Sequence, residues 1–134
     1  MSDDLTVPAP ATAVLAVLIR ERLPAEFSTV WVGTQIPSPR PARIVRVART
    51  PGGGMAAQGQ TDQMFALVEC WAATEDDAED LANLVRAILK SSRSNTVLGT
   101  FVRSWKENSG PYRWPDESGQ ERFQFTGELL LKIG

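Results

Sequence analysis

Glu69 is the residue of this 134-residue chain whose surroundings come nearest to a catalytic setting. It interrupts an apolar strand face that carries Phe65, Leu67 and Trp71. A carboxyl group among apolar side chains is stabilised in its neutral form, which makes it a candidate general acid. The sequence spacing places no second group beside it, and the absence of histidine excludes serine–histidine and cysteine–histidine nucleophiles. We therefore expect that the protein is not an enzyme.

Cys70 is the single cysteine, and its position in an apolar run is typical of a buried, inert thiol. One cysteine cannot form an intramolecular disulfide, and without histidine it cannot complete a structural zinc site. The acidic residues 75–77 follow Thr74, so capping of a helix N-terminus explains them better than a metal site. The glycine-rich residues 51–54 lack the lysine of a phosphate-binding loop. We expect neither a metal nor a cofactor.

Arg43, Arg46 and Arg49 recur at three-residue spacing in a stretch rich in valine and isoleucine. On a strand this spacing places arginines on both faces, which is typical of an edge strand. The three are candidates for contact with a nucleic-acid backbone or an acidic partner chain. The alternative is a solvated edge without a partner.

The segment Tyr112-Arg113-Trp114-Pro115 places large aromatic side chains and an arginine in a polar connection. Tyrosine, tryptophan and arginine are the residues that most often anchor protein interfaces. Tyr112, Arg113 and Trp114 are therefore candidate contacts with a partner or a second subunit. The alternative is that Trp114 folds back and covers the core.

Two helices and five strands are predicted from the periodicity of the apolar residues. The first helix spans residues 11–23 and ends before Pro24. The second begins after the N-cap Thr74 and ends in the region of Lys90 and Arg93. The strands cover residues 28–34, 42–50, 62–72, 97–106 and 120–133. This order, α-β-β-β-α-β-β, predicts one α+β domain over residues 1–134, with a mainly antiparallel sheet packed against two helices.

Three connections complete this arrangement. Residues 1–10 are expected to form an N-terminal arm, and the glycine-rich residues 51–60 a mobile loop at the tip of a protruding β-hairpin. Residues 107–119 are expected to form a long connection. The strand at 62–72 is apolar on both faces, so its second face, which includes Trp71, requires a second layer or a neighbouring subunit.

The formal net charge of -2 gives no support to a dedicated DNA-binding domain. No run approaches the roughly 18 continuous apolar residues of a membrane span, and no membrane partner is expected. Asp3 and Asp4 stand where a secretory signal would carry basic residues. We expect the protein to be cytosolic when it is made.

Three short sequence segments lie in these elements, in this order: Arg46-Val47-Ala48-Arg49-Thr50-Pro51-Gly52-Gly53, Val68-Glu69-Cys70-Trp71-Ala72, and Gly110-Pro111-Tyr112-Arg113-Trp114-Pro115-Asp116-Glu117. Together with the helix that begins after Thr74 and the segment from Arg122 to Gly127, they resemble the tail terminator proteins of long-tailed (siphovirus-type) phages, especially phages of actinobacteria. The resemblance extends from about residue 12 onward.

The resemblance implies an α+β subunit that forms a homohexameric ring on the tail tube. Such a ring stops polymerisation of the tube protein and presents a docking surface to the head-completion, or stopper, protein. DNA passes through its lumen without specific binding. The family has no catalytic residues to transfer, so Arg43, Arg46, Arg49, Trp71, Tyr112, Arg113 and Trp114 remain interface candidates on physical grounds.

Other functions stay open at this point. A head–tail connector or neck protein of similar size would bind the portal side instead of the tube. A small cytosolic ligand-binding domain or enzyme would need a concave pocket with convergent polar groups. A nucleic-acid binder that uses the three arginines would bind DNA with strong salt dependence.

Overall fold

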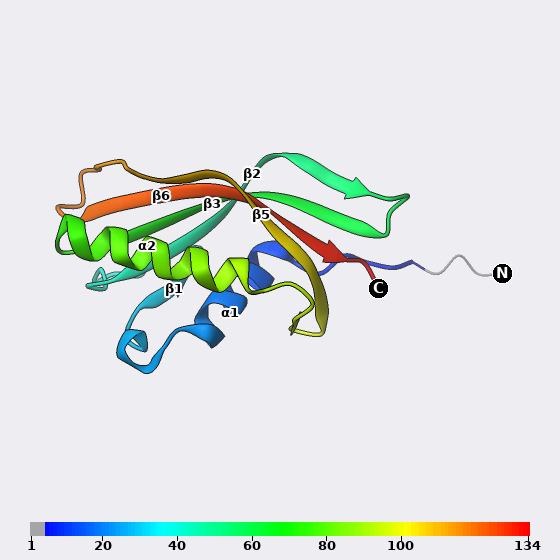
Figure 1. The fold of residues 1–134 in the computed structure, drawn as a ribbon, viewed down its shortest axis with the longest axis horizontal. Helices are drawn as coiled ribbons and strands as arrows, with labels where there is room; N and C mark the ends of the chain where they lie inside the picture. The colour runs from blue at the N-terminus through cyan, green and yellow to red at the C-terminus, as the bar shows by residue number, and fades with distance from the viewer. Residues whose placement is uncertain (1–4) are drawn as a thin grey trace.

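Two helices and a six-stranded sheet form the fold, which the computed structural model describes for residues 5–134 (Figure 1). Residues 1–4 of the predicted arm lie outside the described residues. The helices are α1 (Ala11–Arg22) and α2 (Glu75–Lys90), and a 3₁₀ turn, η1 (Ala25–Phe27), follows α1. The strands are β1 (Trp31–Gly33), β2 (Ile44–Ala56), β3 (Thr61–Ala72), β4 (Thr96–Val97), β5 (Thr100–Arg113) and β6 (Glu121–Lys132).

The strand order across the sheet is β1-β2-β3-β6-β5-β4. Only β1 and β2 run parallel, and the other neighbouring pairs are antiparallel. The predicted α+β class, the order of the main elements and the protruding hairpin are confirmed (Figure 1). The short elements η1 and β4 are additions that the apolar pattern did not indicate.

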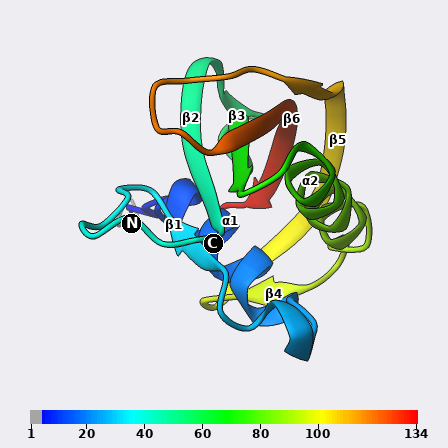
Figure 2. The ribbon, with the colours of Figure 1, turned by 90° about the vertical axis from the view of Figure 1, so that its left-hand side faces the viewer.

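Both helices bury their apolar stripes against one face of the sheet, in a single hydrophobic cluster (Figure 2). Val14, Leu15, Leu18 and Ile19 of α1 are fully buried, and Pro24 follows directly after the helix has ended. Helix α2 begins as predicted, because the Thr74 hydroxyl accepts a hydrogen bond from the backbone N–H of Asp77 at 3.2 Å.

The alternation predicted for the last strand is confirmed in β6. Phe123, Phe125, Leu129 and Leu131 are buried on the face that the helices cover. The polar residues between them lie on the opposite face, which no helix covers, and we call it the helix-free face. Its polar and aromatic side chains hold the candidate site.

The prediction of a loop over residues 51–60 is wrong for residues 51–56, which belong to strand β2. A register shift between Arg49 and Gly53 absorbs the proline and the glycines, and the turn itself is confined to residues 57–60. Proline is tolerated here because β1 pairs only with Ile44–Arg46, which leaves the rest of β2 as an edge strand among the described residues. The β2–β3 hairpin extends beyond the rest of the sheet (Figure 1).

The long connection predicted over residues 107–119 is also wrong for its first half. Strand β5 continues to Arg113, and three register shifts against β6 accommodate residues that break a regular ladder, Pro111 among them. Tyr112 and Arg113 therefore pair with Gln124 and Phe123 on β6. A bulged edge strand explains why local sequence signals of a loop failed here.

The indole ring of Trp105 on β5 lies across Gly127 of the neighbouring strand β6. A β-carbon at Gly127 would lie 2.2 Å from Cζ2 of the Trp105 ring and 2.7 Å from the carbonyl oxygen of Lys106. The ring in turn packs edge-on against Phe125, with centroids 6.3 Å apart. The absence of a side chain at this position therefore fixes how β5 packs on the core.

We expect Gly127→Ala to lower the free energy of unfolding by about 1–3 kcal/mol, because the indole ring must leave its place on the core. Urea denaturation followed by tryptophan fluorescence measures the change. Gly110→Ala is the matched control in β5, where the added methyl would meet only the Arg86 guanidinium and the Glu107 carboxylate, the nearer at 3.6 Å. A Gly127→Ala variant as stable as the control would contradict this packing.

Candidate functional site: a polar network and an exposed aromatic pair

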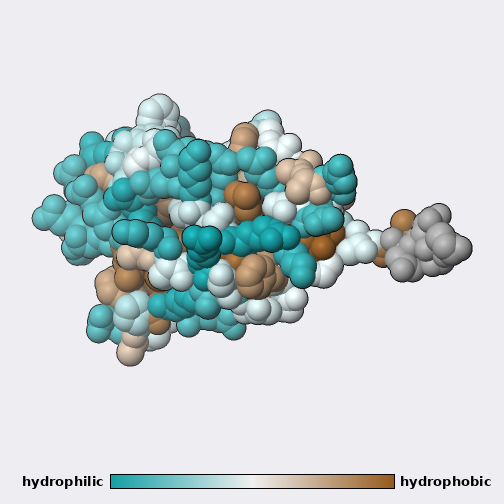
Figure 3. Space-filling model, turned by 45° about the vertical axis from the view of Figure 1, so that its right-hand side comes forward, coloured by the Kyte–Doolittle hydropathy of each residue, from teal (hydrophilic) through white to brown (hydrophobic). Residues whose placement is uncertain are grey.

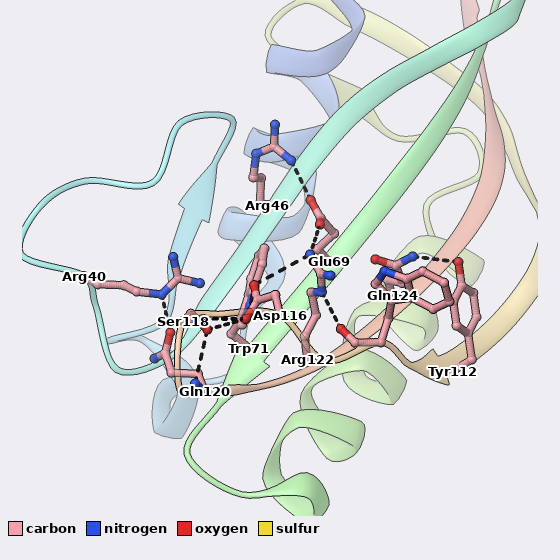
Figure 4. A network of polar contacts seen from close by, with 11 residues as sticks. Arg40, Arg46, Glu69, Trp71, Tyr112, Asp116, Ser118, Gln120, Arg122 and Gln124 are labelled. Carbon is pink, nitrogen blue, oxygen red and sulfur yellow. Dashed lines mark hydrogen bonds and ion pairs between the residues drawn. The ribbon is translucent and has the colours of Figure 1, made fainter.

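Glu69 is the centre of the network on the helix-free face, where its carboxylate is almost fully buried (Figure 4). Arg46 Nη1 donates to one carboxylate oxygen at 2.6 Å, and Arg122 Nη1 donates to the other at 2.8 Å. These residues belong to β2, β3 and β6, so the two ion pairs join three neighbouring strands. Both oxygens of the residue that the sequence singled out as a general acid are thus occupied by structural partners.

Trp71 lies next to this carboxylate and is covered by charged groups from two loops and from β6. The guanidinium groups of Arg40 and Arg122 lie over its ring, 4.9 Å and 5.4 Å from the centroid. Its indole N–H donates to Asp116 Oδ2 at 2.9 Å. The side chain is only 3% exposed, so this interface candidate is buried within its own chain.

Gln120 connects the two loops that cover Trp71. Its side-chain oxygen accepts a hydrogen bond from Arg40, and its amide nitrogen donates to the carbonyl oxygens of Pro41 and Ala42 at 3.0 Å each. The proline-rich connection before β2 is thereby tied to the turn between β5 and β6. The second layer expected over the helix-free face is, at this end, supplied by these loops.

Asp116 orders the turn between β5 and β6. Its Oδ1 accepts hydrogen bonds from the backbone N–H and the hydroxyl of Ser118, at 3.0 Å and 2.5 Å. Burial by itself would raise the pKa of Asp116, but the hydrogen bonds from Ser118 and Trp71 and the charge of Arg122 outweigh it, so the pKa is lowered. The ionised carboxylate therefore stabilises the folded turn.

Tyr112 and Trp114 form an edge-to-face aromatic pair at the end of β5, with ring centroids 6.0 Å apart. Trp114 is 56% exposed and Tyr112 38% exposed, so Trp114 does not fold back over the core. Gln124 donates to the tyrosine hydroxyl at 2.7 Å. Arg122 fixes the backbone of Trp114 by donating from Nε to its carbonyl oxygen at 2.7 Å. The pair is therefore an exposed surface with a defined geometry.

Arg113 lies between these two rings in sequence and makes its contacts elsewhere. It pairs with Glu121 at 2.6 Å and approaches Glu75 at the start of α2 at 3.8 Å. The hydrogen bond and the charge of Glu121 raise the pKa of the guanidinium. Arg113 anchors the turn to β6, while the aromatic rings remain exposed.

The three arginines of the predicted edge are not brought together. Arg43 donates to Thr29 Oγ1 at 3.0 Å and lies over the ring of Phe27. Arg46 joins Glu69, and Arg49 pairs with Asp62 at 3.2 Å. Because each faces a different neighbour, the three do not form one cationic surface for a nucleic-acid backbone.

A concave surface lies between α2 and β5, and we call it the α2–β5 groove. It has a volume of about 560 Å³ and is lined by Asn83, Arg86, Ala87, Lys90, Trp105 and Glu107. Arg86 and Glu107 pair across it at 2.5 Å, and this hydrogen bond lowers the pKa of Glu107. Residues 83, 86, 87 and 90 have the spacing of one helix face. They are polar, charged and small side chains, so the sequence pattern did not predict a groove.

Cys70 is fully buried, and burial together with the Glu69 charge raises the pKa of its thiol. The prediction of a buried thiol is confirmed. Among residues 5–134, no three histidine, cysteine, aspartate or glutamate side chains gather where they could hold a metal ion. Within the same residues, no helix has the length and apolar character needed to cross a membrane.

No known protein family matches this chain, and no curated protein sequence is similar to it.

Glu69→Ala should lower the free energy of unfolding by about 3 kcal/mol, because it removes the partner 2.8 Å from the largely buried Arg122 and leaves only Asp116, at 3.7 Å, as a counter-charge. Urea denaturation measures this change. Glu79→Ala, an exposed glutamate on α2, is the matched control and should stay within about 0.5 kcal/mol of the unchanged chain. Equal stability of the two variants would show that the Glu69 ion pairs contribute nothing.

Acidification should release the turn between β5 and β6. Because the pKa of Asp116 is lowered in the folded state, its stabilising effect is complete above the ordinary value of 3.8 and is lost as the pH falls through the lower folded-state value. We expect the fluorescence of Trp71 to change in this pH range. The transition should be absent in Asp116→Asn, which cannot titrate, and its persistence there would exclude Asp116 as the cause.

Proposed function

We propose that this chain is a structural tail terminator of a long-tailed phage and forms a homohexameric ring on the end of the tail tube. The ring stops polymerisation of the tube protein and presents a docking surface to the head-completion, or stopper, protein. It acts in the virion at the head–tail junction, after assembly in the host cytoplasm. This assignment is supported by the three sequence segments quoted above and by the order of the elements that contain them.

The observation that carries the binding role is the exposed pair of Tyr112 and Trp114. Burying two large aromatic rings against a partner removes much apolar area from water. The rings are also held in place before binding, by Gln124 and by the network around Arg122, which lowers the entropy cost of association. A rigid, exposed aromatic surface is typical of an interface hot spot.

A ring subunit needs two different surfaces, because head-to-tail contacts close only when each copy uses both. The aromatic pair and the turn beside it lie at one end of the sheet, and the β2–β3 hairpin lies at the other (Figure 1). Met55 on that hairpin is 64% exposed. An exposed aromatic pair at one end and an exposed methionine at the other are consistent with such a chain of contacts.

The charges are consistent with a lumen through which DNA passes without specific binding. The formal net charge is -2, and Arg43, Arg46 and Arg49 are engaged by neighbours within the chain. Tight sequence-independent binding of DNA would require several arginines or lysines directed at phosphates.

Negative-stain electron microscopy and native mass spectrometry of the purified protein, with and without tail tubes, test this proposal. We expect hexameric rings that cap tube ends and prevent further growth. A chain that stays monomeric and never associates with tubes would contradict the proposal. Association with the portal side alone would identify a neck or stopper protein instead.

Replacing both aromatic residues, Tyr112→Ser with Trp114→Ser, should weaken the association with rings or tubes by about a hundredfold or more, since hot-spot residues each contribute about 2 kcal/mol or more. Sedimentation with tail tubes measures this loss. Phe101→Ser is the matched control, because Phe101 is also a partly exposed aromatic residue of β5, at 37%. An unchanged affinity in the double variant, with the control equally unaffected, would place the interface elsewhere.

A further inference from the structure

The α2–β5 groove lies beside a strand edge that no other strand of the described residues occupies. Strand β4 pairs only with Thr100 and Phe101, and Ser94 and Asn95 exchange backbone hydrogen bonds with Val102. From Arg103 to Arg113, β5 pairs with β6 on one side only. In an antiparallel ladder, alternate residues turn their N–H and C=O groups away from the partner strand. The groove thus presents unpaired backbone groups along one wall.

The floor of the groove is apolar and rigid. Trp105 packs edge-on against Phe125 and lies across Gly127, so its ring is fixed from below. Ala87 of α2 is exposed on the opposite wall and leaves room beside the ring. A strand edge next to a helix and an apolar floor is the geometry in which extended peptides add a strand to a sheet.

The residues that line the groove carry one net positive charge, that of Lys90. Glu107 neutralises Arg86 through their ion pair, while Lys90 has no acidic partner among residues 5–134. An extended segment with apolar residues on one face and acidic residues at one end would match both the floor and the rim.

The segment before α1 has these properties. Leu5 is 92% exposed and Val7 80% exposed, and their two-residue spacing places them on one face of an extended chain. Asp3 and Asp4 precede them in the sequence. The chain before α1 runs past the C-terminus of its own subunit, where Thr6 lies beside Gly134 (Figures 1 and 3). Pro8 lacks a backbone donor and would end the added strand.

We propose that the chain before α1 of one copy, through Leu5 and Val7, adds as a strand to the free edge of β5 in a second copy. Leu5 and Val7 then contact Trp105 and Ala87, and the negative charge that precedes them in the sequence complements Lys90. This inference rests on the self-association in the proposed function, and it assigns one of the contacts between neighbouring copies. Because the arm and the groove are different surfaces, the contact is head-to-tail and is compatible with a closed ring.

The direct test is the binding of a fluorescent peptide with the sequence of residues 2–10 to the full chain carrying Leu5→Ser and Val7→Ser. Removing the two exposed apolar residues keeps the receiving groove free of competing arms. Fluorescence anisotropy should show saturable binding that weakens by about tenfold or more in Ala87→Glu, which places a bulky anion on the groove wall. Ala73→Glu, the same change at an exposed site outside the groove, is the matched control.

Lys90→Glu provides a second variant that leaves the apolar floor intact. It should weaken binding and reduce the dependence of binding on salt, since it reverses one rim charge. Absence of binding at millimolar peptide, or equal binding by Ala87→Glu and Ala73→Glu, would overturn the inference.

Analytical ultracentrifugation of the full chain separates this inference from the ring itself. Rings that form equally well in Leu5→Ser/Val7→Ser, Ala87→Glu and the unchanged chain would overturn the arm contact and leave the proposed function standing. Loss of rings in the first two variants, with Ala73→Glu unaffected, would support the contact. A peptide that binds to a chain that remains monomeric, even with tail tubes, would overturn both the ring and the second copy as the occupant.

Discussion

The carboxylate of Glu69 is removed from water on a face of the sheet that no helix covers, and only arginines stabilise its charge. A buried carboxylate without counter-charges is strongly destabilising, so Arg46 and Arg122 must lie where they do. Arg122 then also covers Trp71 and holds the backbone of Trp114. The ion pairs of one buried charge thus link three strands to the turn between β5 and β6 and to the exposed aromatic pair.

The long edge strands are the second constraint. Strands β2 and β5 both contain proline and glycine, which usually break strands, and both continue through register shifts against their inner neighbours. Short strands cover only one end of each, so long stretches of backbone remain unpaired among the described residues. Proteins seldom leave such edges open without a protective device, and controlled self-association is one use for them.

Strongly periodic segments were predictable from the sequence, and bulged ones were not. The stripes of α1 and α2 and the alternation of β6 each reflect a single buried face, so a local pattern sufficed. We predicted loops for residues 51–56 and 107–113. Both segments are strands because they pair with strands across register shifts, which a local sequence pattern does not reveal. The exposed aromatic pair was found from residue type alone, whereas Arg40, Asp116 and Gln120 carry no local signal. Trp71 was chosen because its strand is apolar on both faces, but loop residues of the same chain that are distant in sequence cover it.

The network around Glu69 buries Trp71 and leaves Trp114 exposed, and we propose that Trp114 contacts a partner chain. Fluorine NMR of protein labelled with 5-fluorotryptophan tests it directly, because each of the four tryptophans gives its own resonance. In the isolated protein, the resonance of Trp114 should shift between light and heavy water while that of Trp71 should not. On addition of tail tubes, Trp114 should lose this solvent shift. A Trp114 resonance that is shielded in the isolated protein, or still solvent-exposed in the assembled state, would contradict the account.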